Sequence, residues 1–150
     1  MSAENKTIAR RVRDEIWNGA ALNLADQVFD SGSVYHVGDT ITPDFGSGPE
    51  GYKKLVTLYR SAFPDARMTL DDVLADGDKV MVRWTARATH KGQLLNLAPT
   101  NKQITVTGID VYRISGGKIQ ETWVNWDALG FLQQLGAVPA LGQTKEQSRS

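Results

Sequence analysis

The chain has 150 residues, of which 41% are apolar and 23% charged, with 17 basic and 17 acidic side chains and no cysteine. A chain of this length buries roughly 70% of the surface of its extended form, enough for one core and one internal pocket but not for two lobes. The balanced charge argues against nucleic-acid and anionic-membrane partners. The absence of cysteine excludes disulfides, thiolate nucleophiles and cysteine-ligated metal clusters.

The N-terminal segment predicts a cytoplasmic protein. Charged residues between Glu4 and Asp14 interrupt the region where a signal peptide needs an apolar core, and no segment approaches the ~18 apolar residues of a membrane span. The lack of cysteine also fits a reducing compartment. The one dense basic run, Arg10, Arg11 and Arg13, is interpreted as a solvated helix face because acidic residues follow it directly.

The first part of the chain has a helical period. Apolar residues at four-residue intervals predict a helix from about Ala3 to Asn18 and a short one from Leu24 to Phe29. The sequence Asp30-Ser31-Gly32 predicts a turn before a short strand, Val34 to Gly38.

A polar loop, Thr40 to Gly48, is long enough to form the rim of a pocket. Ser47 and Glu50 have the spacing of a capping box, and Pro49 occupies the first helical position. These signals predict a helix that continues to Pro64.

After Pro64 the period of the apolar residues changes from about 3.6 to about 2, which predicts strands. Two hairpins are expected. In the first hairpin the turn Asp76-Gly77-Asp78 joins strands from Met68 to Val73 and from Val80 to Ala88. In the second hairpin the turn Ser115-Gly116-Gly117 joins strands from Ile104 to Ile114 and from Ile119 to Asp127. A final helix, Ala128 to Leu135, follows.

This order of elements predicts one α+β domain over residues 1–142, with a curved sheet and helices on one face. A strongly bent sheet of this kind can close over a cavity with help from the long helix. Residues 143–150 are polar and are expected to form a disordered tail.

Asp110 is the single charge on an apolar row of its strand. An acid placed there either finds hydrogen-bond donors or a cation, or its neutral form is favoured and it can exchange protons near neutrality. The first case describes a structural residue, paired with Arg83 or another cation. The second describes a catalytic acid or base, and the sequence leaves both open.

If the alternation is regular, five residues of the last strand share one face: Ile119, Glu121, Trp123, Asn125 and Asp127. Trp123 and Asn125 are candidates for a pocket wall, with one stacking surface and one amide. Glu121 lies near the hairpin end and is expected to be structural or exposed. Asp127 precedes the last helix, where an N-cap stabilises by about 1 kcal/mol, with a role in chemistry as the alternative.

The two histidines are His36, which is expected to face the polar loop as a proton donor or to be half-exposed, and His90, which lies where a strand gives way to a loop. The sequence contains no closely spaced pair of histidines, so it does not predict a metal site. Trp84, Tyr112 and Trp123 are candidates either for the pocket lining or for the core.

Glycine-rich phosphate loops, the dinucleotide fingerprint and the nucleophile elbow are all missing from the sequence. The pattern therefore predicts a pocket without a cofactor, lined by apolar groups and a few acids.

The stretch TGIDVYRISGGKIQETWVNWDALGFLQQLG, Thr107 to Gly136, resembles the C-terminal signature of the SnoaL-like polyketide cyclases, also called ester cyclases. Val82 to Gly92 and Leu97 to Ile104 are similar to the same family. The resemblance implies the cone-shaped α+β barrel of ketosteroid isomerases and nuclear transport factor 2, usually a homodimer with a deep pocket at the wide end. Family members that are cyclases close a ring by an intramolecular aldol condensation, without cofactor or metal.

The resemblance also places the functional residues of the family on this chain. The acid/base aspartate of the cyclases falls on Val124, and their pocket histidine falls on Asp110. Valine cannot move a proton, so the aldol mechanism does not transfer directly. Asp127 matches the recurrent aspartate before the last helix.

The first functional hypothesis is an enzyme that acts on a small hydrophobic, oxygenated molecule. Asp110 is then the acid or base, and His36 and Asn125 position a substrate oxygen in the aromatic pocket. Proton abstraction beside a carbonyl, followed by aldol closure or isomerisation, is the expected reaction. Hydrolysis is a further option if Arg83 orients Asp110.

The second hypothesis is a non-catalytic module for small-molecule binding or dimerisation that lacks the acid because Val124 stands in its place. Recognition of another protein on the exposed sheet is a third possibility, but no apolar exposed patch is evident in the sequence.

Overall fold

The computed structural model of the chain describes residues 2–140 and 142, so the tail expected at 143–150 lies outside the described residues. The predicted order of elements is confirmed. The elements are α1 (Ser2–Arg11), the π-helical segment η1 (Val12–Trp17), the 3₁₀ segment η2 (Leu22–Leu24), α2 (Ala25–Val28), β1 (Phe29–Val37), α3 (Gly48–Ala62), β2 (Arg67–Asp76), β3 (Lys79–Thr89), β4 (Gln103–Ser115), β5 (Lys118–Trp126) and α4 (Ala128–Leu135).

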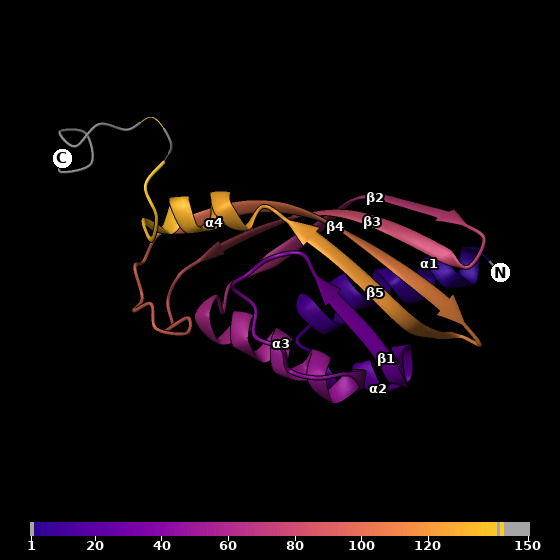
Figure 1. Ribbon diagram of the computed structural model, residues 1–150. Helices are drawn as coiled ribbons and strands as arrows, with labels where there is room; N and C mark the ends of the chain where they lie inside the picture. The colour runs from indigo at the N-terminus through magenta and orange to yellow at the C-terminus, as the bar shows by residue number, and fades with distance from the viewer. Residues whose placement is uncertain (1, 141, 143–150) are drawn as a thin grey trace.

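The strands form one curved sheet in the order β1-β5-β4-β3-β2, with α1 and α3 on the same side of it (Figure 1). Strands β2 to β5 pair as antiparallel neighbours, whereas β1 runs parallel to β5. The curvature leaves an inner face toward the helices and an outer face toward solvent. This is the predicted α+β architecture of the cone-shaped folds.

The predicted turn at Asp30-Ser31-Gly32 is wrong, because these residues lie within β1. Pairing with β5 starts at Phe29 and resumes at Val34 after an irregularity. The Gly32 N–H donates to the Asp30 carboxylate at 3.0 Å, so the turn-forming chemistry is used locally inside the irregular strand.

Helix α3 has Pro49 in its first turn, as predicted, but the capping box is not formed. Ser47 makes no side-chain cap bond, and Glu50 instead pairs with Lys53 at 2.8 Å. With 15 residues α3 is longer than the other α-helices.

Within the described part of the chain, no helix combines the length and the hydropathy needed to cross a membrane.

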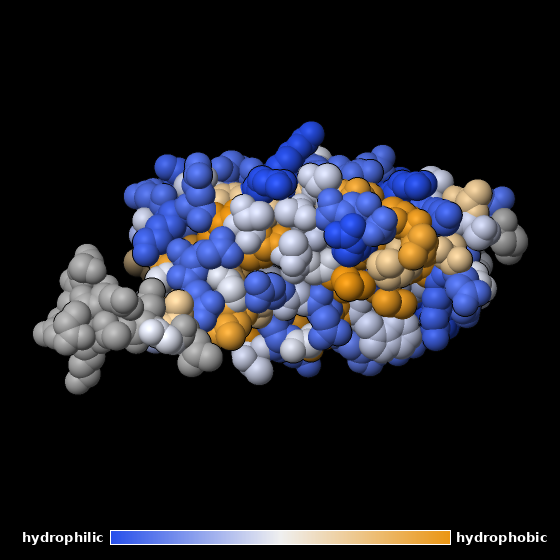
Figure 2. Space-filling model, turned by 90° about the horizontal axis from the view of Figure 1, so that it is seen from above, coloured by the Kyte–Doolittle hydropathy of each residue, from blue (hydrophilic) through white to orange (hydrophobic). Residues whose placement is uncertain are grey.

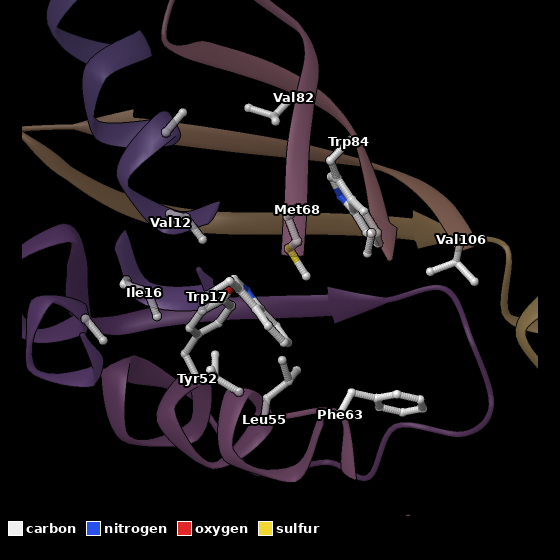
Figure 3. Close-up of a cluster of buried hydrophobic side chains, with 14 of the residues drawn as sticks. Val12, Ile16, Trp17, Tyr52, Leu55, Phe63, Met68, Val82, Trp84 and Val106 are labelled. Atoms are coloured by element: carbon white, nitrogen blue, oxygen red, sulfur yellow. The ribbon is translucent and has the colours of Figure 1, made fainter. Parts of the chain in front are cut away.

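The inner face of the sheet packs on the helices. In β3 and β4 the alternation holds as predicted, so Val82 and Trp84 of β3 and Val106 of β4 are buried. Figure 3 shows Trp84 and Val106 directed from the sheet toward the side of the core where Trp17 of η1 and Leu55 of α3 lie.

The alternation changes phase in β5. Arg113 pairs with Glu121 but Ile114 pairs with Ile119, so the β5 side contains one extra residue. A β-bulge of this kind moves every later side chain to the opposite face. The prediction that Glu121, Trp123 and Asn125 share the face of Ile119 is therefore wrong. The inner face receives Thr122, Val124 and Trp126 instead.

The outer face carries a row of mostly apolar residues, called the apolar row below, that the sequence pattern does not predict. Cross-strand pairing aligns one residue from each strand. In sheet order these are His36, Trp123, Val111, Met81 and Leu74. Figure 2 shows hydrophobic side chains gathered toward one end of this face. The row could not be recognised in the sequence because each strand contributes only one of its members.

Candidate functional site

An inner cavity of about 80 Å³ lies between the inner face of the sheet and the helices. Its wall is mostly apolar and aromatic; examples are Trp17, Leu55, Phe63, Trp84, Trp126 and Phe131. Figure 3 shows four of these side chains around the buried cluster. The polar members of the wall are Arg13, Tyr35, Asp39, Thr42 and Tyr59. An apolar cavity with a few polar groups is the usual setting of a ligand site.

Asp110 lies behind this wall, fully buried and bonded to four donors. Its Oδ2 accepts from Arg13 Nε at 2.9 Å and from Arg13 Nη2 at 2.5 Å. The Tyr112 hydroxyl donates to the same oxygen at 2.5 Å, and Trp84 Nε1 donates to Oδ1 at 3.1 Å. Oδ2 is saturated by three donors, and Oδ1 is buried with the rest of the side chain, so Asp110 is not accessible to a substrate in the cavity.

This geometry corrects the expectation of an acid stranded in an apolar recess. Asp110 is the buried partner of a guanidinium, which was the structural alternative, and that guanidinium belongs to Arg13 rather than to Arg83. Arg83 lies on the outer face, where it pairs with Asp72 at 2.7 Å. Asp110 does not line the inner cavity, whereas Arg13 does.

Arg13 presents a cation to the cavity. Of its five N–H groups, two bond to Asp110 and one to the Met68 sulfur at 3.3 Å, so two have no acceptor among the described residues. The guanidinium carbon lies 4.3 Å from the Trp84 ring centroid and 5.3 Å from that of Trp17. Burial opposes the charge, yet Asp110 and the nearby tyrosines leave the pKa of Arg13 above its ordinary value.

The interpretation of Arg13 as part of a solvated helix face is wrong. Arg13 is 2% exposed and lies in the π-helical segment η1, where Val12, Ile16 and Trp17 are buried as well. No signal in the sequence separates it from Arg10 and Arg11, because arginine in a charged helix is usually exposed.

A hydrogen-bonded chain at the cavity rim was also missed. Asp39 Oδ2 accepts from Trp126 Nε1 at 2.6 Å and from Thr42 Oγ1 at 3.0 Å, and its Oδ1 accepts two backbone N–H groups at 2.7 Å. Thr42 Oγ1 also lies 2.6 Å from the Tyr59 hydroxyl. Because the single Thr42 proton points to Asp39, Tyr59 must donate to Thr42. The loop identified as a pocket rim therefore supplies Thr42, and Asp39 directly precedes it.

Two tyrosines line the cavity in the neutral, protonated form. Burial raises the pKa of Tyr59 to about 12, although the hydrogen bond with Thr42 opposes the shift. Burial also raises the pKa of Tyr35 well above its ordinary value. The Tyr35 hydroxyl has no hydrogen-bond partner among residues 2–140 and 142, so it is available to a ligand.

His36, Glu121, Trp123 and Asn125 lie on the outer face and not in the cavity, contrary to the expectation for three of them. His36 Nε2 lies 2.7 Å from Glu121 Oε2, and its ring stacks on Trp123 at 5.6 Å. The hydrogen bond with His36, and then Arg113, lowers the pKa of Glu121. Asn125 is exposed.

Of the other candidates, one lines the cavity and the rest lie outside it. Trp84 lines the inner cavity, whereas Tyr112 is fully buried behind it. Asp127 is exposed and accepts the Gly130 N–H at 2.9 Å, as an N-cap of α4 does. His90 is buried and accepts the Thr100 N–H on Nδ1 at 3.2 Å, and its Nε2 has no partner among the described residues. No group of three metal-ligating side chains lies together in that same part of the chain.

The family model that matches this chain is that of the SnoaL-like polyketide cyclases, over residues 7–135. The chain belongs to this family. Val124, on which the resemblance places the cyclase acid, lines the inner cavity.

Solved structures of the family are similar to the chain. A proposed polyketide cyclase from Acidithiobacillus ferrooxidans is 31% identical with a TM-score of 0.78, and 89% of this chain and 95% of that one are covered. A proposed cyclase from Bacillus cereus is 27% identical, with coverage of 90% and 82% and a TM-score of 0.74. IdmH, a proposed cyclase from Streptomyces antibioticus, is 26% identical, with coverage of 88% and 98% and a TM-score of 0.74. No curated protein sequence gives a significant match.

The Arg13–Asp110 pair is expected to show strong energetic coupling. Arg13→Met or Asp110→Asn alone leaves one buried charge unpaired and should cost about 3–5 kcal/mol of the free energy of unfolding. The double variant should cost clearly less than the sum of the single ones, because no lone charge remains.

Urea unfolding of the four proteins measures this coupling. The exposed pair of Arg83 and Asp72 is a matched control, since surface pairs contribute only about 0–1 kcal/mol. An inner coupling no larger than that of the Arg83→Met and Asp72→Asn cycle would contradict the expectation.

Burial of His90 predicts a specific pH dependence, because burial lowers the pKa of His90 in the folded protein. The unfolded chain then takes up the proton first, so the free energy of unfolding should fall as the pH drops below about 6.5 and level off at the lower folded pKa. The His90→Phe variant keeps the ring stacking on Phe63 but lacks this loss. We expect the free energy of unfolding of the wild type, measured in urea, to decrease relative to that of the variant as the pH falls through this range. A free-energy difference that does not change with pH would refute the assignment.

Proposed function

We propose that this chain is an enzyme that removes a proton beside a carbonyl of a small apolar molecule bound in the inner cavity. The observation that carries the proposal is Arg13, a cation with two free N–H groups on the wall of an otherwise apolar cavity. A fixed donor in such a place stabilises negative charge that develops on a substrate oxygen. Tyr35, with its free hydroxyl, is a second donor on the same wall.

Asp39 is the carboxylate of the proposed acid/base step, in place of Asp110. Its four acceptor positions are occupied, so the proton reaches it through bonds that already exist. As the C–H bond breaks, Tyr59 oxygen accepts the proton and passes its own to Thr42 Oγ1, and Thr42 passes its proton to Asp39 Oδ2. The electron pair of the C–H bond becomes an enolate whose oxygen is held by Arg13 and Tyr35.

The enolate then has the outcomes expected for this family. Attack on a second carbonyl of the same molecule forms the C–C bond of an aldol ring closure, and return of the proton to another carbon is an isomerisation. Asp110 takes no proton in this scheme. It is the counter-ion that fixes the orientation of Arg13.

Acetophenone is a suitable first probe because it combines one apolar ring with one carbonyl. In deuterium oxide the protein should exchange the methyl protons, followed by NMR, and Arg13→Met should lower the rate about 100-fold, as loss of one charge-stabilising donor does. Tyr59→Phe leaves the ion pair intact and should lower the rate about 10-fold or more.

The Arg83→Met variant is the control. It also loses one arginine, but Arg83 lies outside the cavity, so this variant should exchange at the wild-type rate. Equal rates in wild type, Arg13→Met and Tyr59→Phe would overturn the proposal, as would the absence of exchange above that in buffer.

A non-catalytic binding module is the second candidate. Two features favour it: the resemblance places the cyclase acid on Val124, and neither carboxylate near the cavity is free, because Asp110 is held by Arg13 and Asp39 accepts four hydrogen bonds. Quenching of the cavity tryptophans by acetophenone without any proton exchange would support this candidate.

We also propose that the chain forms a homodimer through the apolar row of the outer face. A second copy would cover Trp123 and Val111 and exclude water from the neighbouring Leu74, which is 59% exposed. Apolar side chains gathered on an otherwise polar face often mark a protein–protein interface.

The variant Val111→Asp places a charge in the middle of the row and should convert a dimer into a monomer in light-scattering chromatography. Thr105→Asp, at an exposed position elsewhere on β4, is the control. A wild-type monomer, or a Val111→Asp dimer, would contradict the proposal.

A further inference from the structure

A second cavity of about 210 Å³ adjoins the inner cavity. It lies between β1, the start of α3 and the loop that follows β1. Tyr35, Asp39, Thr42 and Leu55 line both cavities and form the wall between them. The two spaces are therefore neighbouring compartments on either side of the free Tyr35 hydroxyl.

The second compartment is polar where the first is apolar. Ser33 of β1 and Thr122 of β5 are 5% and 1% exposed, and both line this cavity. Neither side chain has a hydrogen-bond partner among the described residues. Neither hydroxyl oxygen is shut off from the cavity, because neither is among the fully buried atoms that lack a partner, so both are open to a polar group of a ligand.

Register explains why the two hydroxyls face the same space. Strands β1 and β5 are parallel neighbours, and Tyr35 pairs with Thr122. Ser33 lies two residues before Tyr35 and therefore shares its face. The bulge in β5 is what brings Thr122 to this face.

The charges around the compartment define the kind of group that fits. Its charged lining residues are Asp39 and Asp44, and no lysine or arginine is present among the lining residues described. A carboxylate or phosphate is disfavoured there by repulsion. A hydroxyl can donate to one wall oxygen and accept from the other.

We propose that the two compartments form one site for amphipathic ligands, with a carbonyl-bearing ring in the inner cavity beside Arg13 and a neutral hydroxyl-bearing end between Ser33 and Thr122. The proposal rests on the proposed function for the position of the ring. It adds the substrate class: a ring ketone extended by a hydroxylated chain.

Three compounds test the proposal by quenching of the cavity tryptophan fluorescence. They are 4-(4-hydroxybutyl)acetophenone, 4-pentylacetophenone, in which a methyl replaces the hydroxyl, and 4-(4-acetylphenyl)butanoic acid, which carries a carboxylate. The wild-type protein should bind the alcohol about 10-fold more tightly than the pentyl compound, as expected for paired buried hydroxyls, and should bind the acid most weakly.

The double variant Ser33→Ala/Thr122→Val should abolish the preference for the alcohol while the affinity for the pentyl compound stays within about twofold. Ser31→Ala, at an exposed position of β1, is the matched control and should keep the preference. If the double variant does not fold, Ser33→Ala alone should reduce the preference about threefold, and Thr122→Ser should retain it.

The outcomes separate this proposal from the proposed function. If the alcohol and the pentyl compound bind equally, or the acid binds best, the hydroxyl site is refuted while Arg13-dependent exchange of acetophenone still stands. If an alcohol preference persists in the double variant, Ser33 and Thr122 do not carry it and the assignment is wrong. If none of the compounds binds, both proposals fail.

Discussion

Two opposite charges, buried far from water on Arg13 and Asp110, connect the helical layer to the sheet. Each charge alone would be strongly unfavourable in this interior, so the pair fixes how η1 sits against β4. Asp110 also fixes two neighbouring side chains, because it accepts hydrogen bonds from the Tyr112 hydroxyl and the Trp84 indole N–H. The side of the pair that remains open to the cavity is the cation. This polarity decides which chemistry the cavity can support.

The site that results is divided by polarity. On one side of Tyr35 the cavity offers aromatic walls and a guanidinium, and on the other side it offers hydroxyls and carboxylates. Asp39 and Thr42 line both parts, and their hydrogen-bonded partner Tyr59 lines the inner cavity. Membership of the SnoaL-like family accounts for the architecture, but the position to which the resemblance assigns the cyclase acid is occupied by Val124 on the cavity wall. Function in this chain must therefore depend on other polar groups of the wall.

Prediction from sequence succeeded where the pattern was regular and local. The alternation in β3 and β4 identified the buried row that includes Trp84 and Asp110, and Asp127 was recognised as a helix cap from its place before α4. Prediction failed in β5, because one extra residue in a bulge reverses the phase and the sequence does not mark where it occurs. The placement of Trp123 and Asn125 was lost with it. His36 was assigned from its closeness to the polar loop, which does not determine the face of β1 on which it lies.

By itself the sequence determined the class of fold, the order of helices and strands, the family and the presence of one acid in an apolar row. Hydrophobic periodicity and turn chemistry encode these features within short windows of the chain. Only the tertiary structure decided that Arg13 neutralises this acid, that Asp39 and Thr42 reach Tyr59, and that Ser33 and Thr122 share a compartment. Those contacts join segments far apart in the chain, and burial of a charge or a hydroxyl depends on what the opposite layer brings to it.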